Sequence, residues 1–208
     1  MEDLYKYEKE LWKKGYKYVA GVDEVGRGPL IGPVVTACVI LPKNFVLEGL
    51  TDSKKLTEKK REEFYPYIME NALSVSIGIK SEKVIDKVNI YEATKLAMYD
   101  AINKSPIKPD WVLIDAMKLD LDMPSTSIIK GDSKSISIAA ASVIAKVTRD
   151  RMMIELDKKY PMYGLKDHKG YGTKKHIEAI YKYGLIDGYR KTFKPISDIL
   201  EKNIAKNK

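Results

Sequence analysis

Four carboxylates in motif-like surroundings are the residues of this chain best suited to chemistry. Asp23 and Glu24 lie in GVDEVGRGP, Asp115 ends VLID, and Asp132 lies in IIKGDSKS. The first three fall at predicted strand ends, and Asp132 precedes a predicted long helix. Carboxylate oxygens are the ligands that Mg²⁺ and Mn²⁺ prefer. In a basic chain, this pattern predicts a divalent-metal site that acts on phosphate.

Each of these carboxylates also has an ordinary structural interpretation. Asp23 and Glu24 could be surface acids before a turn, Asp115 could end a strand, and Asp132 could be the N-cap of the following helix. Side chains alternate across a regular strand, so the adjacent Asp23 and Glu24 should point to opposite faces unless the glycine-rich turn relaxes the strand. The individual residues leave both interpretations open, and only their combination with further motifs favours a metal site.

Three further motifs suit contacts with a nucleic acid. Gly26, Arg27 and Gly28 form a GRG whose peptide groups can approach a sugar or phosphate closely, with a tight turn as the alternative. Tyr171 stands between two glycines in HKGYGT, where its ring could stack on a base or sugar or simply support the loop. Lys54, in DSKKL, precedes a predicted helix and is either a phosphate contact or a solvated lysine. The chain has neither a P-loop nor a GxGxxG fingerprint.

Composition narrows the class of protein. The chain has 208 residues, a formal net charge of +8 and a pI of about 9.2, which suits one domain that binds a polyanion. No apolar run is long enough for a transmembrane helix, and the charged first residues do not read as a secretory signal. The single cysteine, Cys38, excludes an intramolecular disulfide and a cysteine-based zinc site. We therefore expect a cytoplasmic protein without a membrane contact.

Hydrophobic periodicity predicts strands that alternate with helices. The predicted strands cover 16–24, 34–41, 73–79, 111–115 and 125–129, and the predicted helices cover 3–15, 57–71, 90–104, 135–159, 173–183 and 195–204. The first three strands should form a meander interrupted by one helix, within a mixed sheet covered by helices. In the longest helix, Ser142, Lys146 and Arg149 share one side, apart from the apolar positions.

Taken together, the motifs resemble those of ribonuclease HII of the bacterial type. The matching segments, between about residues 18 and 173, are GVDEVGRGPLIGPVV, DSKKL, VLIDA, IIKGDSKSISIAAASVIAKVTRD and HKGYGT. The related ribonuclease HIII family usually has lysine in place of Arg27. One departure is the segment Tyr189-Arg190-Lys191-Thr192-Phe193, where the family often has His-Arg-x-Ser-Phe.

The resemblance implies an α/β fold of the ribonuclease H type, with a mixed five-stranded sheet flanked by helices. We expect one domain over residues 1–208, with a core at about 16–160 and a small helical C-terminal part at about 161–208. The implied activity is cleavage of the RNA strand of RNA–DNA hybrids, and nicking on the 5′ side of a ribonucleotide in duplex DNA. The products would carry 5′-phosphate and 3′-hydroxyl ends.

The resemblance also assigns roles to residues. The carboxylates that would hold two Mg²⁺ or Mn²⁺ ions for catalysis are Asp23, Glu24, Asp115 and Asp132. The backbone groups that would read the ribose 2′-hydroxyl belong to Gly26, Arg27 and Gly28. Tyr171 would stack on the neighbouring deoxyribose. Independently of the resemblance, we expect three cations to contact phosphates: Lys54, Lys146 and Arg149. A monomer suffices, and no convincing motif predicts a sliding-clamp contact through the tail.

Two rival functions come from other classes. A non-catalytic, basic nucleic-acid-binding module explains the net charge, but clustered acids would repel its ligand unless a metal neutralised them. A phosphatase or phosphotransferase with an aspartate nucleophile is the second rival, and no accompanying signature supports it. Metal-dependent cleavage of an internal phosphodiester distinguishes the three functions.

Overall fold

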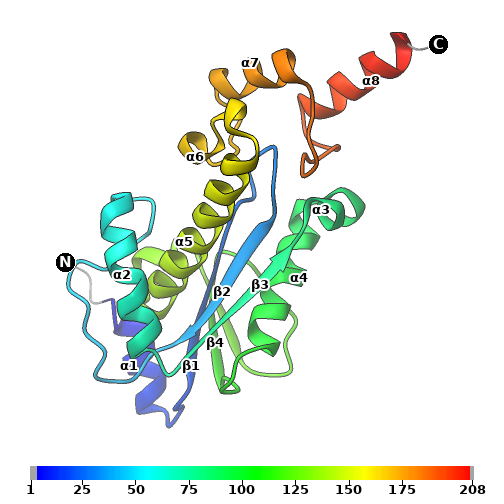
Figure 1. The fold of residues 1–208 in the computed structure, drawn as a ribbon. Coiled ribbons are helices and arrows are strands. Elements are labelled where there is room, and N and C mark those ends of the chain that lie inside the picture. Colours follow the sequence, from blue (N-terminus) through cyan, green and yellow to red (C-terminus); the bar gives the residue numbers. More distant parts are fainter. Residues whose placement is uncertain (1–3, 207–208) are drawn as a thin grey trace.

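A five-stranded mixed sheet forms the centre of the computed structural model, which describes residues 4–206 (Figure 1). Its order is β3-β2-β1-β4-β5, with bounds Val19–Val25 for β1, Val34–Ile40 for β2, Ser74–Lys80 for β3, Trp111–Asp115 for β4 and Ser125–Ile128 for β5. The first three strands pair antiparallel, whereas β4 pairs parallel with both β1 and β5. The predicted meander and the mixed five-stranded sheet are confirmed.

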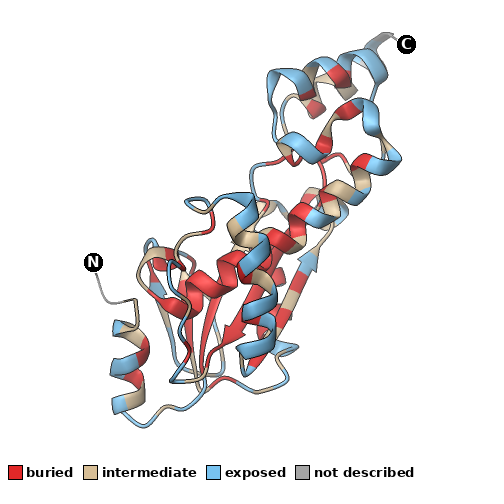
Figure 2. Cartoon of the chain, turned by 60° about the vertical axis from the view of Figure 1, so that its left-hand side comes forward, coloured by how far each residue is buried: buried red, intermediate tan, exposed pale blue. Residues whose placement is uncertain are grey.

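Helices cover both faces of this sheet. On one face lie α1 (Lys6–Lys13), α2 (Glu58–Asn71) and α5 (Ile136–Lys159), and on the other lie α3 (Glu82–Val88) and α4 (Ile90–Asn103). The alternation along β2 divides the core accordingly, because Ala37 packs with α2 and α5 while Cys38 packs with α4. Figure 2 shows the buried side of α5 lying along the sheet.

The C-terminal part gathers at the far end of α5 (Figure 1). It consists of η2 (Pro161–Tyr163), α6 (Leu165–His168), α7 (Lys174–Tyr183) and α8 (Ile196–Lys206). Its own apolar cluster includes Leu30, Ile31 and Met153, so it packs on the segment after β1 and on the last turns of α5. The sequence did not predict α3, η2 or α6, because helices of one or two turns are too short to show a clear helical periodicity. Within residues 4–206, no helix combines the length and apolar character needed to cross a membrane.

The first turn of α5 lies directly on the backbone of β1. A Cβ atom at Gly21 would stand 2.1 Å from the carbonyl carbon of Ser137, so only glycine permits this approach. Glu8, a fully buried residue of α1, holds the same turn, because its carboxylate accepts bonds from the Ser135 hydroxyl (2.5 Å) and the Ser137 N–H (3.0 Å). A carboxylate at a helix N-terminus is also favoured by the helix dipole.

We expect Gly21→Ala to lower the free energy of unfolding by about 3 kcal/mol or more, because the helix must move off the strand. Gly184→Ala is the comparison, since Gly184 has a φ of 83° and open space around its Cβ position. With a ψ of −167°, Gly184 lies in a backbone region that is essentially restricted to glycine, so this substitution should cost only that backbone strain, about 1–3 kcal/mol. Denaturant unfolding of both variants checks this, and a smaller loss for Gly21→Ala would contradict the close-packing argument.

Candidate metal centre and substrate-binding loops

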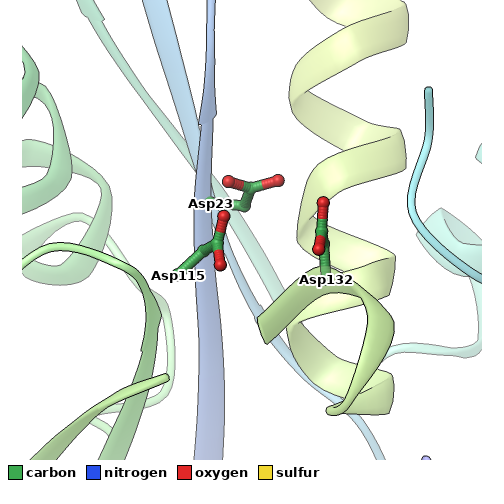
Figure 3. Close-up of side chains that lie close together, drawn as sticks. All are labelled: Asp23, Asp115 and Asp132. Atoms are coloured by element: carbon green, nitrogen blue, oxygen red, sulfur yellow. The ribbon is translucent and has the colours of Figure 1, made fainter. Parts of the chain in front are cut away.

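Three aspartates from three elements converge at one end of the sheet (Figure 3). One carboxylate oxygen from each of Asp23, Asp115 and Asp132 lies within 4.8 Å of the other two. Asp23 and Asp115 come from neighbouring parallel strands, in which Val22 pairs with Ile114, so the next residue of each strand lies on the same face. Asp132 comes from η1 (Gly131–Ser133), the turn that leads into α5.

Local hydrogen bonds hold these side chains in place. The Asp115 carboxylate accepts the Gly131 N–H at 2.6 Å, which ties the end of β4 to the turn that carries Asp132. Asp23 accepts the N–H of Glu24 at 2.7 Å. Asp132 is not the N-cap of α5, because Ser135 fills that position and accepts the N–H of Ile138. The structural alternative for Asp132 therefore does not hold.

Glu24 stands apart from this group of three. On β1, Asp23 pairs with Ala37 on the α5 side, whereas Glu24 pairs with Thr36, whose hydroxyl bonds to α4. The two neighbours thus alternate, as the regular strand predicted. One oxygen of Glu24 lies 3.6 Å from the Arg27 guanidinium, and the other is buried without a hydrogen-bond partner among the described residues. That second oxygen is free to meet a cation.

Mutual repulsion and burial raise the pKa values of the clustered carboxyl groups, so that they hold their protons to higher pH. Burial raises the pKa of Asp132 to about 6, and the charges of Asp115 and Asp52 add to the shift. Burial, together with Glu24 and Asp115, raises the pKa of Asp23 well above its usual range. The pKa of Asp115 is also raised by burial, although the Gly131 N–H opposes the shift. A bound cation would relieve this repulsion.

Lys54 supplies positive charge at this site. Burial disfavours its ammonium, but the carboxylates of Asp23, Asp52 and Asp132 together raise its pKa. Two serines hold the Lys54 loop on α5, since the Ser142 hydroxyl donates to that of Ser53 at 2.8 Å. Asp52 and Ser53 are also neighbours of the site, and both belong to the DSKKL motif, in which the sequence pointed only to the lysines.

The GRG motif and the Tyr171 loop lie against each other. A Cβ on Gly28 would stand 3.2 Å from a ring carbon of Tyr171, and that tyrosine is 43% exposed. The Leu30 N–H donates to the Gly170 carbonyl at 2.9 Å, which joins the two segments through their backbones. The fold thus brings together two motifs that are more than 140 residues apart in the sequence.

A family comparison agrees with this arrangement. The model of the Ribonuclease HII family matches residues 20–196. The chain belongs to the ribonuclease HII family. Ribonuclease HII of Bacillus mycoides (strain KBAB4) is 58% identical over 200 residues, which are 96% of this chain and 78% of that protein.

Solved structures show the same fold. The crystal structure of the ribonuclease H2 from Pyrococcus horikoshii OT3 has a TM-score of 0.74 and 30% identity, covering 88% of this chain and 97% of that one. The ribonuclease HII in the structure of the PCNA:RNase HII complex from Archaeoglobus fulgidus has a TM-score of 0.73 and 27% identity, over 85% and 95% of the two chains. As a member of the ribonuclease HII family, the chain is a metal-dependent endoribonuclease that acts on RNA–DNA hybrids.

The oxygen donors of the candidate metal centre fit a hard divalent cation. Within the part of the chain that the structure describes, the converging ligands are carboxylates only, and the free oxygen of Glu24 is a further candidate. Oxygen ligands without sulfur or imidazole suit Mg²⁺ and Mn²⁺ better than zinc. The chain's own residues therefore match the cofactor class that its family uses.

One predicted phosphate contact is wrong. Arg149 is fully buried, and its guanidinium donates to the carbonyls of Ile31 (3.1 Å), Pro33 (3.0 Å) and Lys169 (3.0 Å). Helical spacing correctly placed it on a polar side of α5, but the segment after β1 and the C-terminal part together cover that side at this turn. Its charge therefore supports the fold and does not face a nucleic acid.

Lys146 is only partly available to a phosphate. Its side chain is 16% exposed, and its ammonium pairs with Asp150 at 2.6 Å. Asp150 also lies 3.8 Å from Arg61, so the three residues form a small charge network between α2 and α5. Burial lowers the pKa of Lys146, although the bond to Asp150 opposes the shift.

We expect the metal-free protein to lose stability as pH rises from about 4 to about 7. The folded chain holds the Asp132 proton up to a pKa of about 6, whereas the ordinary value is 3.8, so the folded state binds more protons in this window. The stabilisation that comes from the Asp132 proton is complete below the pKa of this group in the unfolded chain, and it is lost as the pH rises through its pKa in the folded chain. Denaturant unfolding with chelator across this range measures the slope.

Two further experiments test the cause of this pH dependence. Added Mg²⁺ should restore stability near pH 7, because it replaces the proton as the counter-charge. Asp132→Asn should flatten the pH dependence of the metal-free protein. A slope unchanged in Asp132→Asn would show that the carboxylate group is not its source.

Proposed function

We propose that the chain hydrolyses the RNA strand of RNA–DNA hybrids and nicks duplex DNA on the 5′ side of an embedded ribonucleotide. The products would carry 5′-phosphate and 3′-hydroxyl ends. The observation that carries the proposal is the convergence of Asp23, Asp115 and Asp132 within 4.8 Å, in a chain with a net charge of +8. Clustered carboxylates repel phosphate unless cations lie between them, so this geometry favours a metal-dependent reaction on a polyanion.

In this proposal, Asp23, Asp115, Asp132 and Glu24 hold two Mg²⁺ or Mn²⁺ ions. When bound, such cations supply an activated water and stabilise the leaving 3′-oxygen. Lys54 stands beside the carboxylates, and we assign it to a phosphate of the substrate. Lys146 would join it once its pair with Asp150 opens.

Substrate selection belongs to the loops beside the metal centre. We assign reading of the 2′-hydroxyl to the backbone of Gly26, Arg27 and Gly28, and stacking on the adjacent deoxyribose to Tyr171. Support comes from the contact between Gly28 and the half-exposed Tyr171 ring, since one nucleotide step could touch both. Glycine at position 28 leaves the space that a sugar requires.

A monomer can provide this whole site, because every assigned residue comes from one chain. We further propose that the protein acts in the cytoplasm, in ribonucleotide excision repair and during replication, where such junctions arise. The Archaeoglobus fulgidus protein was solved in complex with PCNA. We assign no clamp contact to the tail of this chain, which lacks a convincing motif for one.

The first test is cleavage of a DNA duplex with one ribonucleotide, in Mg²⁺, in Mn²⁺ and in chelator. We expect a metal-dependent nick immediately 5′ of the ribonucleotide. If only longer hybrids were cleaved, the result would support the metal-centre assignment and refute the junction-sensing role of Tyr171. Binding without any cleavage would favour the non-catalytic module.

Asp115→Asn should lower turnover by more than about 100-fold, since it removes a charged ligand oxygen while keeping the side-chain shape. Affinity for the duplex should persist, because one negative charge is lost. Asp120→Asn, at an exposed position five residues further along, is the matched control and should cleave normally. Single-turnover kinetics and a binding titration measure both properties, and near-normal cleavage by Asp115→Asn would refute the metal-site assignment.

Tyr171→Ala should lower kcat/KM on the single-ribonucleotide duplex by about 10- to 100-fold, the cost of one lost stacking contact. Its affinity for all-DNA duplex should change far less. Tyr91→Ala removes a similarly exposed tyrosine from α4, on the opposite face of the sheet, and should leave both values unchanged. Equal losses in cleavage and in non-specific binding would contradict a sensing role for Tyr171.

A further inference from the structure

The C-terminal part returns to the end of the sheet beside the GRG motif. Residues 188–190 run alongside residues 30–32, the segment that follows the motif. The Arg190 N–H donates to the Leu30 carbonyl at 2.9 Å, and an antiparallel bridge joins the neighbouring residues. The side chain of Arg190 therefore enters the molecule directly behind the GRG backbone.

Arg190 is fully buried, and the hydrogen bonds of its side chain go to backbone carbonyls of this region. Its guanidinium donates to Gly26 (2.5 Å), to Arg27 (2.9 Å) and twice to Gly32 (3.0 and 2.9 Å). Among the described residues, no carboxylate forms an ion pair with it. Burial lowers its pKa to about 9, and neighbouring Arg149 contributes, so the group stays protonated at neutral pH.

These bonds determine the direction of the next amides. In a planar trans peptide, the carbonyl of one residue and the N–H of the next point in opposite directions. Because Arg190 holds the carbonyls of Gly26 and Arg27 inward, the N–H groups of Arg27 and Gly28 point away from the interior. No hydrogen bond from either N–H occurs within residues 4–206. Glycine-rich backbone would otherwise sample many orientations.

Arg149 performs a related task on the other side of the motif. Its bonds join the carbonyls of Ile31 and Pro33 to that of Lys169, two residues before Tyr171. A Cβ at Gly26 would stand 2.3 Å from the Arg149 Nε, so the motif rests on this guanidinium. The two buried arginines thus fix the GRG backbone and its distance from the tyrosine loop.

We infer that Arg190 is a positioning residue for sugar recognition: it aims the amide N–H groups of Arg27 and Gly28 at the 2′-oxygen of the ribonucleotide. This inference rests on the function proposed above. The C-terminal part would thus contribute to specificity through its contacts with the GRG backbone. It would not itself need to touch the nucleic acid. The residue type fits this role, because the rigid guanidinium makes four bonds to these carbonyls from a fixed planar fork, whereas a lysine ammonium has only three donors at the end of a flexible stem.

The test compares the affinities of the protein for two duplexes. Every variant also carries Asp115→Asn, so that the bound duplex is not cleaved during the measurement. The ligands are a DNA duplex with one ribonucleotide and the same duplex without it, in Mg²⁺. Arg190→Lys and Arg190→Met should lower the preference for the ribonucleotide by about tenfold, the value of one lost hydrogen bond. Affinity for the all-DNA duplex should stay the same. Partial unfolding lowers both affinities equally, so their ratio remains informative for either variant.

Tyr163→Phe is the matched control. It removes a hydroxyl that donates to the Gly184 carbonyl in the same C-terminal cluster, and this hydroxyl has no bond to the GRG motif or to the Tyr171 loop. It should keep the full preference for the ribonucleotide. A preference unchanged in both Arg190 variants, or lost equally in Tyr163→Phe, would overturn the inference. Failure of the proposed function is distinguishable, because the parent Asp115→Asn protein would then show no preference at all.

Discussion

Direct contact between the first turn of α5 and the backbone of β1 is the constraint on which the site geometry depends. At Gly21 there is no side chain between helix and strand, and Glu8 of α1 holds the same turn through two hydrogen bonds. The turn before this helix carries Asp132, and the strand carries Asp23 two residues beyond Gly21. A helix held further from the sheet would separate these carboxylates.

The same packing concentrates negative charge inside a basic protein. Carboxylates from β1, β4 and η1 share a partly buried space, and each has a raised pKa because burial and its neighbours oppose ionisation. Lys54 offsets part of this charge. The remaining negative charge favours the binding of cations, which would relieve the repulsion among the carboxylates.

The proposed recognition of the ribose depends on backbone groups of the GRG motif, and two buried arginines contact that backbone region. Arg149 comes from α5 and Arg190 from the C-terminal part, so both large elements of the fold contribute to one loop. Their bonds go to carbonyls, whereas exposed arginines usually meet carboxylates or phosphates. This arrangement links the helical C-terminal part to the catalytic end of the sheet without placing it in the site.

The sequence by itself indicated the strands, the long helices and the mixed sheet, and it suggested the carboxylates of the candidate site, because periodicity and motif spacing are local properties. It left open whether Asp23 and Glu24 alternate or whether the glycine-rich turn brings them together. Only the tertiary structure decided which side of α5 the C-terminal part covers, and hence that Arg149 is buried. It likewise placed Asp52 beside Asp132 and Arg190 behind the GRG motif. Helical spacing gives a direction around the helix axis, but what lies in that direction depends on the packing of distant segments.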